Sequence, residues 1–122
     1  MSTLVVKYNE VDPYITKDGS TIRELIHPDQ HGVVKQSLAE AIVPAGSTTK
    51  RHYHGKSEEL YYIIAGEGLM MLGDEQFTVT QGDTVCIPPK TEHCIQNSGE
   101  HELVILCCCS PAYSHDDTVL LE

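Results

Sequence analysis

The chain has 122 residues, of which 8 are Lys or Arg and 18 are Asp or Glu, so its formal net charge is −10. A chain of this length forms one domain with a real hydrophobic core and is short for two domains. The negative charge argues against nucleic acid or an anionic membrane as a partner, since both attract a basic surface. An anionic small molecule stays open as a partner, because the charge around one pocket can oppose the charge of the whole protein.

No stretch of the sequence approaches the roughly eighteen consecutive apolar residues of a membrane-spanning helix. The amino-terminal MSTLVVKYNEVDP also lacks the basic start and the long apolar run of a signal peptide. We therefore expect a cytoplasmic protein. Its five cysteines, three of them adjacent at Cys107, Cys108 and Cys109, do not form the pattern of a disulfide framework. Strand alternation turns Cys108 away from the other two, which favours small buried hydrophobes over a cysteine metal site.

Short strands are predicted along the whole chain, separated by Gly, Pro, Asp and Asn. In the amino-terminal arm, residues 1–30, we expect a strand at 4–8, then an extended loop, and a strand at 21–25. The further predicted strands are 33–43, 50–54, 60–64, 68–72, 76–79, 83–87, 93–97 and 102–109. Residues 111–122 follow a proline and are predicted to be an irregular tail. With no long helical period and no internal repeat, this pattern predicts an all-β sandwich or barrel.

Three candidate metal ligands lie close together in the segment GSTTKRHYHGKSEELYYIIAG. In an extended strand alternate side chains share a face, so His52 and His54 project together while Tyr53 points the other way. The following GKSE is predicted to be a turn, and Glu59 starts the next strand. This hairpin brings the carboxylate opposite the two imidazoles, a combination that suits a divalent metal.

A fourth candidate ligand follows about forty residues later, in GDTVCIPPKTEHCIQN. His93 begins a short apolar strand after the rigid Pro88-Pro89 turn. A single histidine is more often an ordinary surface or hydrogen-bonded residue. A second block that carries its own Gly, Pro and His strengthens the case for a site.

Both blocks resemble the two sequence motifs of the cupin superfamily, and the resemblance covers about residues 33–110. The first motif is matched at Gly46, His52, His54, Glu59 and Gly66, and the second at Gly82, Pro88, His93 and Asn97. Lys90 stands where the family usually has Gly. The resemblance implies a small single-domain, metal-binding cupin with a jelly-roll β-barrel, also called a double-stranded β-helix. It further implies that His52, His54, Glu59 and His93 hold one divalent metal ion per chain.

Three imidazoles and one carboxylate fill four positions of an octahedral ion and leave two for water, a chelating substrate, or a substrate together with dioxygen. From related cupins we expect manganese or iron, and nickel, cobalt or zinc suit the same ligands. Strand parity places Tyr61 on the inward face with Glu59, and Lys50 on the face of His52 and His54. Tyr61 is a candidate proton donor or a core residue, and Lys50, like Lys90, is a candidate contact for an anion. The expected apolar cavity wall is Leu38, Ile42, Ile63, Met70 and Ile95.

These features predict a metal-dependent enzyme that acts on a small oxygenated, possibly anionic metabolite, with a dioxygenase ranked ahead of an isomerase or lyase. The alternative is a metal-containing module that binds a sugar or metabolite without converting it. Fold alone does not choose between them. The segments 60–64 and 102–109 are apolar on both faces, so the outer face of the barrel needs a cover. We therefore expect a homodimer with the amino-terminal arm at the interface, the alternative being a monomer whose arm folds back.

Overall fold

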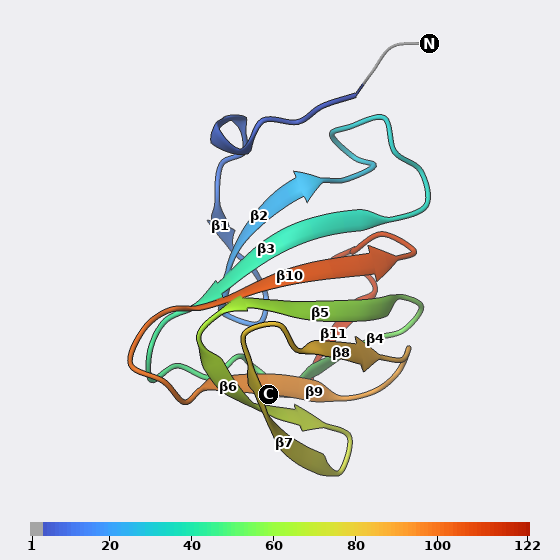
Figure 1. Ribbon diagram of the computed structural model, residues 1–122. Coiled ribbons are helices and arrows are strands. Elements are labelled where there is room, and N and C mark those ends of the chain that lie inside the picture. Colours follow the sequence, from blue (N-terminus) through green and yellow to red (C-terminus); the bar gives the residue numbers. More distant parts are fainter. Residues whose placement is uncertain (1–3) are drawn as a thin grey trace.

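The structure is a computed structural model that describes residues 4–122, and it consists of two antiparallel sheets that face each other (Figure 1). Its elements are η1 (Tyr8–Glu10), β1 (Tyr14–Ile15), β2 (Thr21–Ile26), β3 (Ser37–Val43), β4 (His52–His54), β5 (Glu58–Ala65), β6 (Glu67–Leu72), β7 (Glu75–Thr80), β8 (Thr84–Ile87), β9 (His93–Asn97), β10 (Leu103–Ser110) and β11 (Thr118–Leu120). Within residues 4–122, no helix has the length and apolarity that crossing a membrane requires.

The sheets are built from strands that are far apart in the sequence. One sheet has the order β1-β2-β3-β10-β5-β8 and the other the order β11-β4-β9-β6-β7. Strands β5 and β10 pair in the middle of the first sheet, whereas β4 and β9 pair in the second. This is the predicted all-β jelly-roll barrel. Its crossovers place β4, β5 and β9, the three strands with candidate ligands, around one interior.

The predicted strand boundaries agree best inside the barrel and worst near the ends of the chain. The strand at 93–97 has its predicted limits, and the strand at 21–25 is β2, but the strand expected from residue 33 starts only at Ser37. The strand predicted at 4–8 is wrong, because this segment has no sheet partner and ends in the 3-10 turn η1. The tail was predicted to be irregular, yet β11 pairs with β4. The tail therefore belongs to the barrel wall through β11, and the amino-terminal arm belongs to it through β1 and β2.

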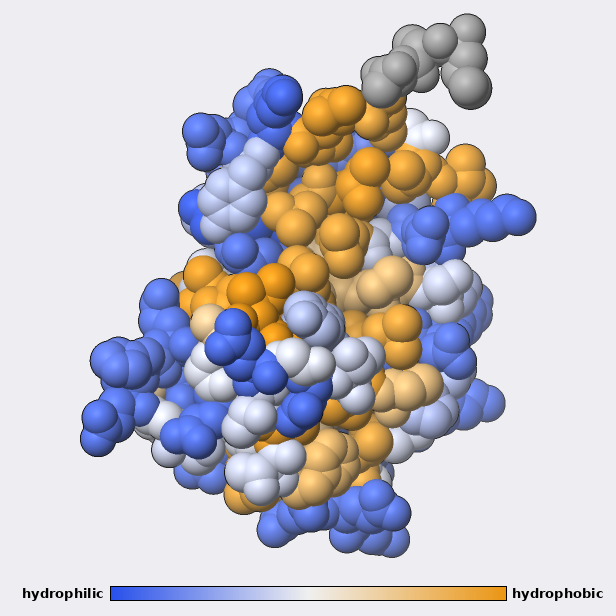
Figure 2. Space-filling model, in the orientation of Figure 1, coloured by the Kyte–Doolittle hydropathy of each residue, from blue (hydrophilic) through white to orange (hydrophobic). Residues whose placement is uncertain are grey.

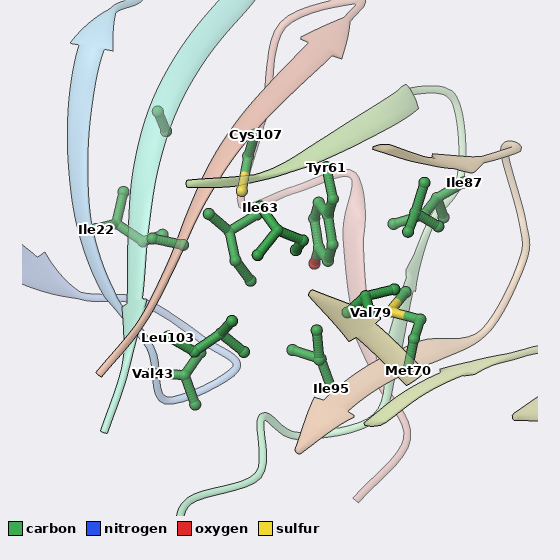
Figure 3. Close-up of a cluster of buried hydrophobic side chains, with 14 residues drawn as sticks. Ile22, Val43, Tyr61, Ile63, Met70, Val79, Ile87, Ile95, Leu103 and Cys107 are labelled. Atoms are coloured by element: carbon green, nitrogen blue, oxygen red, sulfur yellow. The ribbon is translucent and has the colours of Figure 1, made fainter. Parts of the chain in front are cut away.

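The core lies between the two sheets, and part of the predicted cavity wall is placed correctly. Ile63, Met70 and Ile95 are fully buried, and Figure 3 shows them in the cluster with Tyr61 among them. The prediction for Leu38 and Ile42 is wrong: β3 turns its small residues inward and these two large ones outward. Both faces of β3 are apolar, so alternation of hydrophobicity could not show which face is inside. Small inward side chains leave room for a cavity.

The outer face of the six-stranded sheet carries a row of apolar side chains. Leu60, Tyr62 and Ile64 on β5 are 41%, 45% and 39% exposed. Leu38 and Ile42 lie half-buried on the same side, and Figure 2 shows hydrophobic side chains gathered over β3 and β10. Neither the arm nor the tail covers the β5 row within the described part of the chain.

Lys90, the departure from the family motif, adopts the backbone conformation that glycine takes freely. Its φ is +64°, in the left-handed region that costs a residue with a side chain about 1–2 kcal/mol. Its backbone N–H donates to the carbonyl of His54 at 2.7 Å. The turn before β9 therefore keeps its form with lysine in place, and the Lys90 side chain is exposed.

Candidate metal centre

Strand register brings the three candidate histidines together. His52 on β4 lies directly opposite His93 on β9, with their ring centroids 4.3 Å apart. His54, two residues along the same face of β4, has its ring 5.1 Å from that of His52 and 5.4 Å from that of His93. All three are buried, and one nitrogen from each lies within 4.8 Å of the others. The predicted convergence of these imidazoles is therefore present in the fold.

Glu59 approaches this group from the opposite sheet. The predicted hairpin is therefore wrong, because the turn after His54 leads from one sheet to the other and β4 does not pair with β5. Glu59 is the second residue of β5 and is buried, and its Oε1 lies 3.1 Å from Nε2 of His54 and 3.5 Å from Nε2 of His93. Burial alone would raise the pKa of this carboxyl, but the neighbouring His54 and His93 outweigh it and lower the pKa to about 2. Glu59 is therefore an ionised carboxylate at neutral pH.

Hydrogen bonds at the far side of two of the rings determine which nitrogen carries the proton. Nδ1 of His52 lies 2.7 Å from the carbonyl oxygen of Lys50, and Nδ1 of His93 lies 2.9 Å from that of Thr91. A carbonyl only accepts, so each Nδ1 holds a proton, and Nε2 is the nitrogen that faces the interior. Burial, and then the charge of His93, lowers the pKa of His52, which keeps that ring neutral and able to bind a metal.

The third ring is oriented by the carboxy-terminal tail. Thr118 on β11 donates its hydroxyl proton to the carbonyl of Ser114 at 2.9 Å, so its oxygen accepts from Nδ1 of His54 at 3.0 Å. Nε2 of His54 faces the carboxylate of Glu59, and Nε2 of His93 is buried with no hydrogen-bond partner among residues 4–122. Three imidazole nitrogens and a carboxylate oxygen that converge on one buried point fit a divalent metal.

A cavity of about 40 Å³ adjoins this group, and much of its wall comes from the two ends of the chain. Tyr14, Asp18 and Glu24 contribute from the amino-terminal segment, and Tyr113 and Thr118 from the tail. None of these residues is predicted from the sequence to be part of the site, since none belongs to a motif and each lies far along the chain from the predicted ligands. The expected cavity inside strands 33–110 therefore has a wall that the motif-bearing strands do not supply.

The two side chains predicted to act beside the metal have different positions. Tyr61 is buried and lines the cavity, with its ring centroid 6.1 Å from that of His93. Burial, and then the charge of Glu59, raises its pKa, so the hydroxyl stays protonated. Lys50 is exposed and does not line the cavity, so its predicted inward direction is wrong. The strand β4 begins only at His52, and alternation does not extend back to Lys50.

The cysteine cluster follows the predicted alternation. Cys107 and Cys109 line the cavity, whereas Cys108 lies half-buried on the other face. The thiol of Cys109 donates to Oε2 of Glu59 at 3.3 Å, and burial and then the charge of Glu59 raise its pKa. Cys109 therefore acts as a neutral thiol that holds the carboxylate, opposite which it lies in the β10–β5 ladder. Among the described residues, the group of side chains close enough to share a metal consists of His52, His54 and His93 and includes no cysteine.

Comparison with known proteins supports this assignment of motifs. Residues 39–109 match the family model described as a cupin domain. The whole chain is 58% identical over 122 residues to the uncharacterized protein MJ1618 of Methanocaldococcus jannaschii, of which it covers 98%. Among solved structures, a variant of PAC13 from Streptomyces with uridine has a TM-score of 0.80 at 18% identity, with 100% of this chain and 93% of that chain covered. Oxalate decarboxylase of Lactobacillus farciminis in complex with formate has a TM-score of 0.80 at 26% identity, with 93% of this chain and 34% of that chain covered.

Proposed function

Because the chain belongs to the cupin family, we propose that it is a metal-dependent enzyme that binds a small oxygenated metabolite at a divalent ion. His52, His54, His93 and Glu59 would hold the ion. The observation that carries this proposal is the convergence of Nε2 of His54 and Nε2 of His93 on Oε1 of Glu59, at 3.1 Å and 3.5 Å. We expect manganese or iron as the ion, which when bound supplies Lewis acidity to oxygen atoms of the substrate.

The cavity wall indicates how the substrate is held. Four protein ligands leave two positions of an octahedral ion, which suits a substrate that chelates through two vicinal oxygens. No Lys or Arg lines the cavity in the part of the chain that the structure describes, whereas Asp18, Glu24 and Glu59 do. An anionic end of the substrate is therefore held at the metal centre, and the rest is held by hydrogen bonds to hydroxyl and carboxyl groups.

Proton-bearing side chains beside the metal favour an isomerase or lyase over a dioxygenase. The hydroxyl of Tyr61 and the thiol of Cys109 are both protonated at neutral pH and both line the cavity. Tyr61 would donate a proton to a substrate oxygen or carbon, which is the step that isomerisation and elimination need. Neither group is required for the transfer of dioxygen.

The reaction class is tested with the purified chain loaded with Mn(II) or, under anaerobic conditions, with Fe(II). We expect Mn(II)-dependent conversion of a member of a panel of hydroxy acids, keto acids and sugars without oxygen uptake, and a loss of conversion in Tyr61→Phe. Oxygen uptake with Fe(II) would point to a dioxygenase instead. Ligand-dependent stabilisation without any conversion would favour the non-catalytic binding module.

We further propose that two copies associate through the outer face of the six-stranded sheet. Leu60, Tyr62 and Ile64 form an exposed apolar row in the middle of that sheet, where a second copy would remove them from water. Sedimentation equilibrium should give twice the 13.5 kDa mass of the chain. Tyr62→Glu should reduce this to one chain, whereas Gln76→Glu, at an exposed position on β7, should not.

A further inference from the structure

A second, wider cavity of about 430 Å³ lies outside the one at the metal centre, and the two share part of their walls. Tyr14, Glu24 and Tyr113 line both of them. The outer cavity is otherwise bounded by polar side chains, including Asp29 and His115. We call these three shared residues, which border both cavities, the neck.

Glu24 is the polar side chain of this neck whose bonding is incomplete. It lies on β2, is only 8% exposed, and accepts a hydrogen bond from the Tyr14 hydroxyl on Oε1 at 3.1 Å. Its other oxygen, Oε2, is buried and has no hydrogen-bond partner among the residues from 4 to 122. A buried carboxyl oxygen without a partner lowers the stability of the fold.

We propose that Glu24 is a ligand-contact residue whose free oxygen accepts a hydrogen bond from a hydroxyl group of the metabolite held at the metal centre. This inference rests on the proposed function. The ligand would chelate the metal through oxygen at one end and carry an uncharged, hydroxylated tail through the neck. A carboxylate in the tail would be repelled, since Glu24 and Asp29 line the path and, over residues 4–122, neither cavity is lined by Lys or Arg.

Pairs of sugar acids test this selectivity directly. Glycerate and tartronate, threonate and tartrate, and gluconate and glucarate share a 2-hydroxycarboxylate end and differ in ending in CH₂OH or a carboxylate. Binding of each to the Mn(II)-loaded full chain would be measured by titration calorimetry. In at least one pair we expect the hydroxyl-ended acid to bind at least about tenfold tighter, which is the effect of one good hydrogen bond against a repelled charge.

Glu24→Gln should abolish that preference, because its amide keeps the size of the side chain and can donate to a carboxylate. Glu75→Gln, at an exposed position on β7, should leave the preference unchanged. Tyr14→Phe removes the hydroxyl that positions Glu24 and should reduce the preference without abolishing it. This variant decides the matter if Glu24→Gln fails to fold or to hold Mn(II).

The outcomes separate this inference from the function beneath it. If the acids bind in a metal-dependent way but Glu24→Gln and Tyr14→Phe both discriminate as the unaltered protein does, Glu24 is not a ligand contact, and the proposed metal centre still stands. If none of the six acids binds the Mn(II)-loaded protein, the proposed chelating site is wrong and the role of Glu24 is refuted with it.

Discussion

The strands that carry the proposed metal ligands and the two ends of the chain contribute to the same site in different ways. Strands β4, β5 and β9 supply His52, His54, Glu59 and His93, which lie in the two sequence motifs and are brought together by the pairing of β4 with β9 and the packing of the two sheets. The ends supply Glu24 on β2 and Thr118 on β11, which no motif marks. In the proposed function the motif strands would hold the metal, and the ends would orient its ligands and select what enters. Each prediction below breaks or sharpens this division.

The largest effect is expected at the motif strands. His93→Ala removes a fully buried side chain, proposed as a ligand, whose Nε2 has no hydrogen-bond partner among residues 4–122, so the protein should lose most of its bound metal. The barrel should remain folded, since within the described residues the change breaks a single hydrogen bond, from the ring to the carbonyl of Thr91. Elemental analysis after purification without a nickel column, with circular dichroism for the fold, measures both. His101→Ala, at an exposed position, is the control, and full metal occupancy in His93→Ala would refute the assignment.

A smaller effect on metal binding is expected from the tail. Thr118→Val keeps the shape of the side chain but removes the oxygen that accepts from Nδ1 of His54. Loss of such an outer partner typically costs about 10–100-fold in metal affinity. Thr118→Ser keeps the hydroxyl and should bind almost as well as the unaltered protein. Competition with a chelator gives the affinities. Equal affinity for Thr118→Val and Thr118→Ser would mean that the tail only covers the site.

The difference between the two regions also explains what the sequence could predict. The presence of the four candidate ligands in the motifs and the limits of the strand at 93–97 were predictable, because motif spacing and period-two alternation are signals within short segments. The partner of His54 lies 64 residues away, and nothing near Thr118 in the sequence marks it. The same holds for Glu24, which lies outside both motifs. Its inward direction follows from the register of β2 on β3.

Errors within the barrel have a physical cause of a different kind. Leu38 and Ile42 were placed inside because large apolar residues usually fill a core. In β3 the inward positions belong to Ala39 and Ala41, which line the cavity. A strand that is apolar on both faces has no internal signal for its inward side, and the need for an open cavity and a covered outer face decides it.

The amino-terminal end should show its role as a cost to stability. Burial raises the pKa of Glu24 above its usual 4.5, with Asp29 adding to this and Tyr14, His27 and His115 opposing it. The folded state thus prefers the protonated carboxyl, and this preference adds stability below about pH 4.5 that is lost as the pH rises through the raised value. Glu24→Gln cannot ionise, so it should be more stable than the unaltered protein at pH 7, by about 1 kcal/mol. At pH 4 this advantage should be smaller, because Glu24 itself is then largely protonated in the folded state.

Denaturant melts of the metal-free protein at the two pH values measure this difference. Glu75→Gln is again the control, since its exposed carboxyl should give no pH-dependent change. A Glu24→Gln variant that is less stable than the unaltered protein at pH 7 would mean that the carboxyl supports the fold. The proposal that this end of the chain serves ligand binding at a cost to stability would then weaken.

The smallest effect is expected in the turn of the second motif, at Lys90. Glycine would remove the cost of a left-handed backbone at φ +64°, but it would also give the unfolded chain more freedom, worth about 0.4–1 kcal/mol. The second change offsets part of the first, so Lys90→Gly should stabilise the fold slightly, by less than about 1 kcal/mol, and leave metal affinity unchanged. Gly66→Ala is the contrasting variant, because its φ is +90° and an added Cβ would lie 2.8 Å from the carbonyl oxygen of Glu102. It should be clearly destabilised in the same melts. Glycine keeps the backbone N–H that donates to the carbonyl of His54, so weaker metal binding in Lys90→Gly would mean that the lysine side chain itself acts on the site.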